Sequence, residues 1–335
     1  MVRRLERGQS MEGLRGVMWR EHGEIKYAGR APNFTAMDET PLPDFDEYFY
    51  ARREGGYEDW AEACEPMIPI ETARGCWWGE KHHCTFCGLN RSGMEFRAKS
   101  PDQVLDQLDC LSRKYGVFSF NAIDNIMAPE YAEKVFRRLA EANTDLDIHY
   151  EIRPNFSRMQ LGRMRTGGLC SVQPGVESLA TNILKSMRKM TTGMRNVELI
   201  KWCTYYGIHC MYNILMRFPG ETEEDYRMQA ALLPRILHLQ PPWGIVKARA
   251  DRGSPMLPIR RANLSGGLSR RSVTTTFFPN ASISSGFLII STTIWGTWWT
   301  RSTTTTCSTV WPDGNNSGPK PAIPFCTIAR LFRAS

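Results

Sequence analysis

Three cysteines lie within twelve residues of the chain, in the segment Cys76-Trp-Trp-Gly-Glu-Lys-His-His-Cys84-Thr-Phe-Cys87. An electron-transfer [4Fe–4S] cluster normally takes four cysteines, and a structural zinc ion also takes four ligands. Three thiolates would bind three irons of such a cluster and leave the fourth iron open to a substrate or cofactor. The segment is therefore predicted to hold an iron–sulfur cluster with one open iron.

Two other interpretations of this segment stay open. A zinc ion would combine the three cysteines with His82 or His83, or the thiols are buried cysteines clustered by chance. Each histidine is either a metal ligand or acid–base group, or simply a polar loop residue. The other cysteines are scattered, and Cys110, Cys170 and Cys210 fall in apolar patterns that predict core packing.

Alternating strand-like and helix-like segments follow one another around the cysteines. Strands are predicted over residues 66–72, 117–122, 148–152, 170–176, 208–216 and 243–248, with helices at 100–111, 129–143, 157–168 and 222–239 and from 178 and 193. Strands that alternate with helices of this length imply parallel pairing through right-handed crossovers. Six such units predict an α/β fold, an open and partial (βα)6 TIM-like barrel, with its site at the carboxyl ends of the strands.

The composition of the chain limits the cellular compartment and the classes of binding partner that we expect. The net charge is +7, and no Lys/Arg run of useful length is interleaved with aromatic residues, so nucleic acid is not an expected partner. The N-terminus has no apolar signal core, and no stretch of about 18 residues is free of polar interruption, so no membrane association is expected. A cytoplasmic, reducing setting is predicted, where clustered cysteines are more often metal ligands than disulfides.

The strand, the three cysteines ending in Cys-x-aromatic-Cys and the strand–helix repeats together resemble the radical S-adenosylmethionine superfamily. The fifteen residues from Cys76 to Asn90, with seven residues between the first two cysteines, are similar to the radical enzymes that mature ribosomally made peptides (RiPPs). These are called RiPP maturation radical SAM protein 1 or cobalamin-dependent C-methyltransferases. The resemblance runs from about residue 10 to about residue 250 and implies that residues 66–250 form a radical SAM core domain.

The resemblance implies a chemistry for the three cysteines. Cys76, Cys84 and Cys87 would hold a [4Fe–4S] cluster, and S-adenosylmethionine would chelate its open iron. One electron, from a donor such as flavodoxin or ferredoxin, would generate a 5′-deoxyadenosyl radical that abstracts hydrogen from a precursor peptide. C-methylation is the implied outcome where cobalamin is present. The same chemistry on a tetrapyrrole or an RNA base, and an inactive remnant, stay as alternatives.

Five further residues match positions at which the resembled superfamily contacts S-adenosylmethionine. Phe86 would shield the cluster or pack on the adenine, or is a core phenylalanine. Asp124 would accept a hydrogen bond from the methionine amino group, or forms a turn. Arg153 would pair with the methionine carboxylate or with a neighbouring acid. Glu177 would bind the ribose diol or cap the next helix, and Asn213 would contact the adenine or carboxylate, or makes a core hydrogen bond.

Two kinds of departure from the resembled family stand out. Met190 replaces a usual glycine, and Met216-Arg217 replace a usual Tyr-Gly pair, where added bulk is expected to narrow the cofactor pocket. No Asp-x-His-x-x-Gly cobalamin loop occurs in the chain. Residues 1–65 are therefore interpreted as a linker remnant that follows a missing cobalamin-binding domain. Any cobalamin would be held by the barrel alone or supplied by another chain.

Residues 251–335 differ in texture from the rest. Of the 84 residues from 252 onward, 25 are Ser or Thr, including the runs Thr274–Thr276 and Thr303–Thr306, and acids almost disappear. We interpret this segment as a frame-shifted reading of a normal C-terminal region, with a Ser/Thr-rich disordered tail as the alternative. The frameshift hypothesis fails if no single-base shift of the coding sequence restores an amphipathic C-terminal helix.

Overall fold

The computed structural model describes residues 1–54, 65–90, 93–251 and 253–256. The interpretation of the Ser/Thr-rich tail falls almost entirely outside these residues. The chain divides into two compact units, Met1–Thr40 and a larger one that begins at Pro41. None of the described helices has the length and apolar character needed to cross a membrane.

The first unit contains a β-hairpin that the sequence interpretation did not include. Its elements are α1 (Val2–Glu6), β1 (Met18–Glu21), β2 (Glu24–Tyr27) and the 3₁₀ helix η1 (Met37–Glu39), with β1 and β2 paired antiparallel. The two turn residues, His22 and Gly23, have φ values of +49° and +84°. A two-residue turn with both residues at positive φ matches the twist of paired strands, which explains why this hairpin closes.

The second unit begins before the predicted boundary at residue 66. Helix α2 (Asp46–Glu54) and the residue before it pack on α5 (Pro101–Tyr115). The rings of Phe45 and Phe49 lie 5.9 and 4.6 Å from the ring of Tyr115, and the Phe45 N–H donates to the Tyr115 hydroxyl over 2.7 Å. Part of the predicted linker therefore packs against the hydrophobic core.

The centre of this unit is a parallel sheet, which confirms the predicted α/β class. Five strands pair in the order β3 (Ile68–Ile70), β6 (Ser119–Ala122), β7 (Asp147–Ile152), β8 (Leu169–Pro174) and β9 (His209–Cys210). The predicted strand 208–216 is split in two. Its second half, β10 (Asn213–Met216), pairs in parallel with β11 (Gly244–Lys247), and a single bridge joins Glu177 to Ile214. The strands thus continue around a partial barrel.

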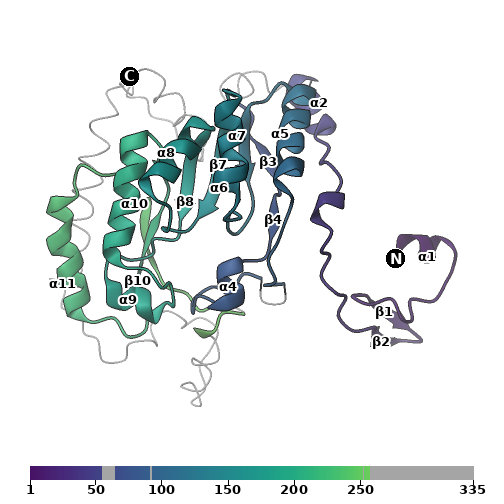
Figure 1. The fold of residues 1–335 in the computed structure, drawn as a ribbon. Coiled ribbons are helices and arrows are strands. Elements are labelled where there is room, and N and C mark those ends of the chain that lie inside the picture. Colours follow the sequence, from purple (N-terminus) through teal and green to yellow (C-terminus); the bar gives the residue numbers. More distant parts are fainter. Residues whose placement is uncertain (55–64, 91–92, 252, 257–335) are drawn as a thin grey trace, which may run out of the picture. The chain divides into compact units, whose positions relative to one another are not determined.

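Helices cover one face of the sheet, where Figure 1 shows α5, α7, α8 and α10 along the strands. The described helices after α5 are α6 (Tyr131–Lys134), α7 (Phe136–Glu141), α8 (Arg158–Thr166), α9 (Thr181–Ser186), α10 (Gly193–Tyr206), α11 (Glu223–Leu232) and the 3₁₀ helix η2 (Leu233–Arg235). Ser100 and Ser157, at which the sequence predicts helices to begin, are the N-caps of α5 and α8. Helix α11 ends seven residues before the predicted Leu239 because Pro234 has no N–H to continue it.

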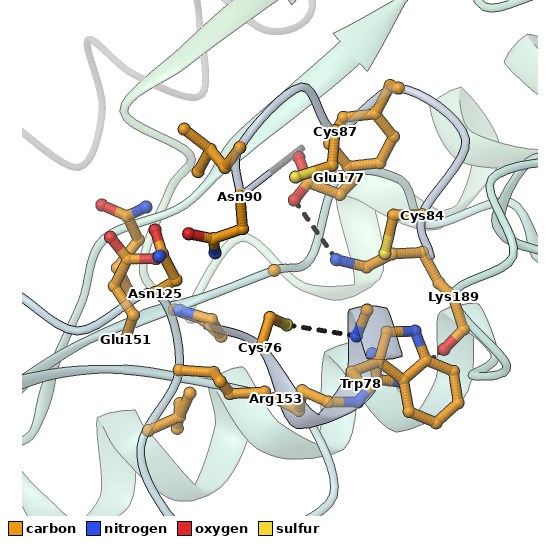
Figure 2. A pocket seen from close by; sticks show the side chains of 18 of the residues that line it. Cys76, Trp78, Cys84, Cys87, Asn90, Asn125, Glu151, Arg153, Glu177 and Lys189 are labelled. Carbon is orange, nitrogen blue, oxygen red and sulfur yellow. Dashed lines mark hydrogen bonds and ion pairs between the residues drawn. The ribbon is translucent and has the colours of Figure 1, made fainter. Parts of the chain in front are cut away.

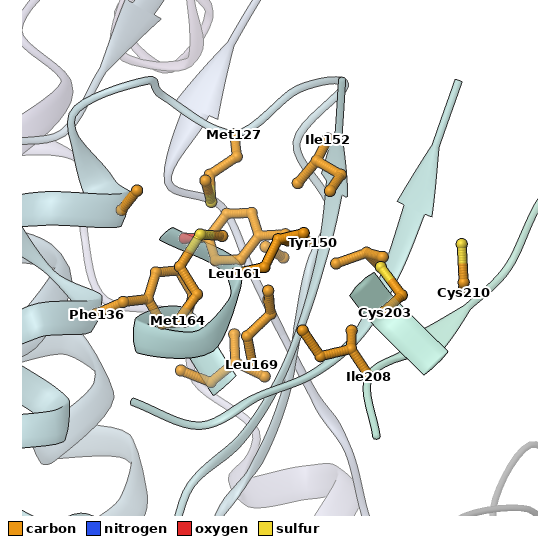
Figure 3. Close-up of a cluster of buried hydrophobic side chains, with 14 of the residues drawn as sticks. Met127, Phe136, Tyr150, Ile152, Leu161, Met164, Leu169, Cys203, Ile208 and Cys210 are labelled. Carbon is orange, nitrogen blue, oxygen red and sulfur yellow. The ribbon is translucent and has the colours of Figure 1, made fainter. Parts of the chain in front are cut away.

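The core lies between the sheet and these helices (Figure 3), with Phe136, Tyr150 and Leu161 almost fully buried in it. Cys210 is buried here, as predicted, and Cys170 is half-buried. The same prediction for Cys110 is wrong, since its side chain is exposed. The buried stripe of α5 consists of Val104, Gln107, Leu108 and Leu111, and position 110 lies on another face of the helix.

We expect a pH-dependent stability from His149, which is buried in β7. Its Nδ1 lies 2.9 Å from the Ser171 hydroxyl oxygen, and burial, with a smaller contribution from His209, lowers the pKa of His149 to about 4. The unfolded chain has a histidine pKa of about 6.5, so it binds a proton that the folded chain does not. The free energy of unfolding should therefore fall by up to about 3 kcal/mol as the pH decreases from about 6.5 to about 4.

Urea unfolding of His149→Gln and of the wild type across this pH window measures the effect. The variant should lose much of the pH dependence, whereas His22→Gln, at an exposed position, should keep it. A His149→Gln protein with the full wild-type pH slope would show that another group is responsible.

Candidate functional site

A cavity of about 250 Å³ lies at the carboxyl ends of the central strands, facing the cysteine segment. Cys76, Cys84 and Cys87 all line it (Figure 2). The rest of its polar lining includes Asn125, Glu151, Arg153, Gln173, Glu177 and Lys189. The cavity therefore occupies the edge at which barrels of parallel strands carry their sites, as the sequence predicts.

The cysteine segment is a loop whose two ends are tied together. Strand β4 (Ala73–Arg74) pairs antiparallel with β5 (Arg97–Ala98), and just inside this ladder the Cys76 N–H donates to the Met94 carbonyl over 3.1 Å. Gly75 has a φ of +77°, and an added Cβ would lie 2.7 Å from the carbonyl carbon of Glu95 and nearer still to its oxygen. Only glycine fits this close approach of two backbone segments.

Within the loop, the first cysteine begins a short helix, α4 (Trp77–Lys81). The Cys76 sulfur accepts a hydrogen bond from the Gly79 N–H over 3.3 Å, which is the contact of an N-cap residue. Gly79 also lies against the Met94 side chain, where a Cβ would collide with the sulfur. These contacts hold the first thiol at the cavity wall.

The second half of the loop is bound to the C-terminal end of α9. The Thr85 N–H donates to the Met187 carbonyl and the Thr85 hydroxyl to the Ser186 carbonyl, both over 3.2 Å. From the first half of the loop, the Trp78 indole N–H donates to the Arg188 carbonyl, just beyond α9, over 3.3 Å. The loop thus provides donors for carbonyls that a helix end leaves without partners. Since Thr85 lies between the other two cysteines, its bonds fix both thiols against the barrel.

Two cations face these thiols. The Arg153 guanidinium donates to the carbonyl of Lys189 and lies 3.5 Å from the centre of the Trp78 ring. The Lys189 ammonium, itself almost fully buried, lies 3.4 Å from a Glu177 carboxylate oxygen. Figure 2 shows these side chains around one space, with Arg153 beside Trp78 and Lys189 opposite Glu177.

Burial and the two cations act on the thiols in opposite directions. Burial raises the pKa values of Cys84 and Cys87; the charges of Lys189 and Arg153 partly offset this at Cys84, and a backbone hydrogen bond from Leu89 and then the charge of Lys189 do so at Cys87. Burial lowers the pKa of Arg153 to about 10, so the guanidinium stays protonated at neutral pH. A cavity with two retained cations suits a ligand or ligand set of negative charge, such as deprotonated thiolates and a carboxylate.

One further acid in the cavity has a perturbed titration. Burial, followed by the charges of Asp124 and Glu177, raises the pKa of Glu151 to about 7, and Lys189 opposes the shift. Near neutral pH its carboxyl group is therefore partly protonated and can either donate or accept a hydrogen bond.

Four of the five further residues predicted from the resemblance line the cavity: Phe86, Arg153, Glu177 and Asn213. The Phe86 ring also packs edge-on against Phe218, with ring centres 6.4 Å apart, so it faces both the cavity and a small apolar cluster. Asn213 begins β10 and is exposed, not a buried amide. The geometry brings these side chains together, and their contacts with a cofactor stay predictions.

Asp124 has a different position from the one expected. It is 1% exposed and does not line the cavity. Its carboxylate accepts hydrogen bonds from the Thr72 N–H over 2.8 Å, the Ala73 N–H over 2.9 Å and the Thr72 hydroxyl. Burial raises its pKa to about 6. Because the Asp124 carboxylate already accepts three hydrogen bonds from the residues that lead into β4, it is not available to a cofactor in the cavity. The neighbouring Asn125 lines the cavity instead.

The two loop histidines are engaged within the loop. The His82 ring lies 4.1 Å from that of Trp78, and His83 Nε2 lies 3.1 Å from the Cys87 carbonyl oxygen. In the described part of the chain, no group of three or more His, Cys, Asp or Glu side chains is gathered around a point where one metal ion would sit. Each cysteine of a [4Fe–4S] site binds a different iron, so three thiols that share one cavity wall fit such a cluster with one open iron.

Sequence analysis did not single out several residues of this site, among them Trp78 and Lys189. Trp78 enters it only as part of the fifteen-residue signature. The turn that brings Lys189 to the cavity has Arg188 and Met190 at φ values of +56° and +49°. Neither residue is a glycine, so the signal for this turn is the glycine that the resembled family usually carries at position 190.

Met190 and Arg217, which replace residues that are usually glycine in the resembled family, affect the backbone conformation. Arg217 has a φ of +58°, so both positions at which the resembled family usually carries glycine have a left-handed conformation. Neither residue lines the cavity, and neither does Met216, so the expected narrowing of the pocket is not found there. The physical consequence is a conformational cost of about 1 kcal/mol or more at each position.

Replacing Met190 by glycine should raise the free energy of unfolding by about 0.5–1 kcal/mol, because it relieves this cost at a side chain that is 69% exposed. Met194→Gly is a matched control, since Met194 is 74% exposed but lies in helix α10. That substitution should lower the free energy of unfolding by about 0.5 kcal/mol. Chemical denaturation of both variants measures the difference. A decrease for Met190→Gly would contradict the assignment of strain.

Comparison with known proteins gives the same fold. The family model described as the radical SAM superfamily matches residues 70–232. An uncharacterized methyltransferase of Pyrococcus horikoshii is 24% identical over 229 residues, which cover 67% of this chain and 48% of that protein. The chain thus spans about half the length of this curated relative.

Two solved structures share the arrangement of elements. One is the cobalamin-dependent S-adenosylmethionine radical enzyme OxsB with aqua-cobalamin bound, at a TM-score of 0.58, 19% identity, and coverage of 72% of this chain and 35% of that one. The other is the radical S-adenosylmethionine methyltransferase TsrM of Kitasatospora setae with tryptophan and an S-adenosylmethionine analogue, at a TM-score of 0.58, 17% identity, and coverage of 76% and 50%. At these identities the likeness is one of fold.

Proposed function

We propose that the chain is a radical enzyme of the radical SAM superfamily, whose family model matches residues 70–232, and that it cleaves S-adenosylmethionine at a [4Fe–4S] cluster held by Cys76, Cys84 and Cys87. The observation that carries the proposal is the gathering of three free thiols from one tied loop on the wall of a single cavity that also holds two buried cations. When bound, the cluster supplies the electron that converts S-adenosylmethionine into methionine and a 5′-deoxyadenosyl radical.

The remaining residues bind and orient the cofactor. Arg153 offers a guanidinium for the methionine carboxylate, because planar paired donors match a carboxylate. Glu177 offers two oxygens to the hydroxyl groups of the ribose, and the Lys189 ammonium, 3.4 Å away, holds that carboxylate in place. Phe86, packed on Phe218, excludes water from the side of the cavity beside the last two cysteines.

We further propose a ribosomally made peptide as substrate and C-methylation as the outcome. The support is the fifteen-residue signature from Cys76 to Asn90, together with the methyltransferase named among the relatives. Methyl transfer would draw on cobalamin, which is bound in the OxsB structure. No observation on the barrel assigns cobalamin ligands, so its supply by another chain is part of the proposal.

The test is a product analysis of anaerobically reconstituted protein with dithionite and S-adenosylmethionine. Formation of 5′-deoxyadenosine is the expected result. Methylcobalamin and a short peptide encoded beside the coding region are then added to the reaction. The mass of the peptide should increase by about 14 units for each hydrogen that a methyl group replaces. Cleavage of S-adenosylmethionine without modification of the peptide would support the proposed radical chemistry and contradict the proposed substrate. No cleavage at all would contradict both parts of the proposal.

A further inference from the structure

The seven residues between Cys76 and Cys84 have a structural consequence that reaches across the cavity. They leave room for helix α4, whose Trp78 faces the end of β7. The Arg153 guanidinium carbon lies 3.5 Å from the centre of the Trp78 ring, and 6.0 Å from that of Trp77. A cation this close to an indole face is in the range of a strong cation–π contact.

The stacked pair is fixed to one turn of the chain. The Trp78 indole N–H donates to the carbonyl of Arg188, and Arg153 donates to the carbonyl of the next residue, Lys189. Arg188 has a φ of +56°, and this left-handed turn presents the two successive carbonyls. Both side chains are therefore held from two directions, by each other and by the same turn.

The guanidinium is poised for an anion. Arg153 is only 7% exposed, and within the described ranges it forms no ion pair with a carboxylate. This includes Glu151, the neighbouring acid that the sequence offered as its alternative partner. A buried cation normally requires a negative partner, and Arg153 lies on the wall of the cavity that holds the three thiols.

We propose that Trp78 is a positioning residue that holds the Arg153 guanidinium in the orientation that receives the carboxylate of S-adenosylmethionine, an inference that rests on the proposed function. An arginine side chain loses conformational freedom when it engages a ligand, and a stacked, tethered guanidinium has already lost it. The indole acts before the ligand arrives, by fixing the guanidinium in place. The long cysteine spacing thus supplies a residue for cofactor binding as well as a cluster ligand.

A double-mutant cycle tests this directly, with the S-adenosylmethionine dissociation constant of cluster-loaded protein as the readout. Trp78→Ala should weaken binding about tenfold, and Trp78→Phe, which keeps an aromatic face, should weaken it by less than about threefold. In an Arg153→Ala background, Trp78→Ala should have no further effect, because its action passes through the missing guanidinium. Equal tenfold losses with and without Arg153 would overturn the proposal.

Iron and acid-labile sulfide are measured on each variant. Trp78→Ala should keep the wild-type content, and loss of the cluster from both Trp78 variants would show that the indole serves the loop and not Arg153. Trp202→Ala is the matched control, since Trp202 stacks with Arg158 at 4.7 Å but does not line the cavity, and it should leave the dissociation constant unchanged. Wild-type protein that assembles a cluster but binds no S-adenosylmethionine would refute the proposed function itself, which this cycle distinguishes from a failure of Trp78 alone.

Discussion

Cys84→Ala should eliminate the formation of 5′-deoxyadenosine, with a loss of at least about 100-fold. Removing a ligand costs more than the 10–100-fold typical of a residue that only supports a ligand. The loop would be left with two thiols, and the Thr85 bonds to Ser186 and Met187 would hold an alanine where the third iron needs sulfur. Anaerobic turnover, measured by chromatography of the nucleoside product, is the direct readout.

Cys110→Ala is the matched control, because Cys110 is an exposed free thiol on α5. It should retain wild-type iron content and turnover. Cys84→Ala protein with full iron content and undiminished cleavage of S-adenosylmethionine would remove the ligand assignment. Retention of iron with loss of turnover in Cys84→Ala would point instead to a cluster of altered nuclearity on the two remaining thiols.

Gly75→Ala should be the most destabilising single-methyl change in the cysteine loop, at about 3 kcal/mol. Its φ of +77° costs an L-residue about 1–2 kcal/mol. The new Cβ would in addition collide with the Glu95 carbonyl, which is backbone and cannot rotate away. Relief of the collision requires β4 and β5 to separate, so the variant should also incorporate less iron.

Gly116→Ala measures the conformational contribution without the collision. Gly116 has a similar φ of +66° at the end of α5, but nothing lies within 4 Å of an added Cβ. It should lose only about 1 kcal/mol, the conformational part alone. Urea denaturation of both variants gives the comparison. Equal losses would mean that the loop ends do not meet as closely as the structure has them.

The positions of the site residues could be predicted wherever a strand end determines them. The three cysteines follow the first strand of the sheet, Arg153 follows β7, and Glu177 follows β8. Because parallel strands bring their carboxyl ends to one edge, sequence order alone places these side chains near one another. The prediction failed by a single residue at Asp124, where the turn after β6 directs one side chain into the core and the next one into the cavity.

Other features depend on contacts that no local pattern encodes. Lys189 reaches the cavity because two non-glycine residues beside it adopt positive φ, a conformation that Arg188 and Met190 do not themselves predict. The contact between Trp78 and Arg153 depends on the packing of the cysteine loop against the end of α9, which brings two distant segments of the chain together. The break between β9, which pairs with β8, and β10, which pairs with β11, is likewise not encoded locally, since a continuous apolar segment predicts one strand.

The most direct test of the central claim is the iron and acid-labile sulfide content of oxygen-free, reconstituted protein. We expect about four iron atoms and about four sulfides per chain, as in a [4Fe–4S] cluster, with an electron paramagnetic resonance signal of the reduced cluster that changes when S-adenosylmethionine is added. Protein that remains colourless, with no sulfide and one equivalent of zinc on the same thiols, would contradict it.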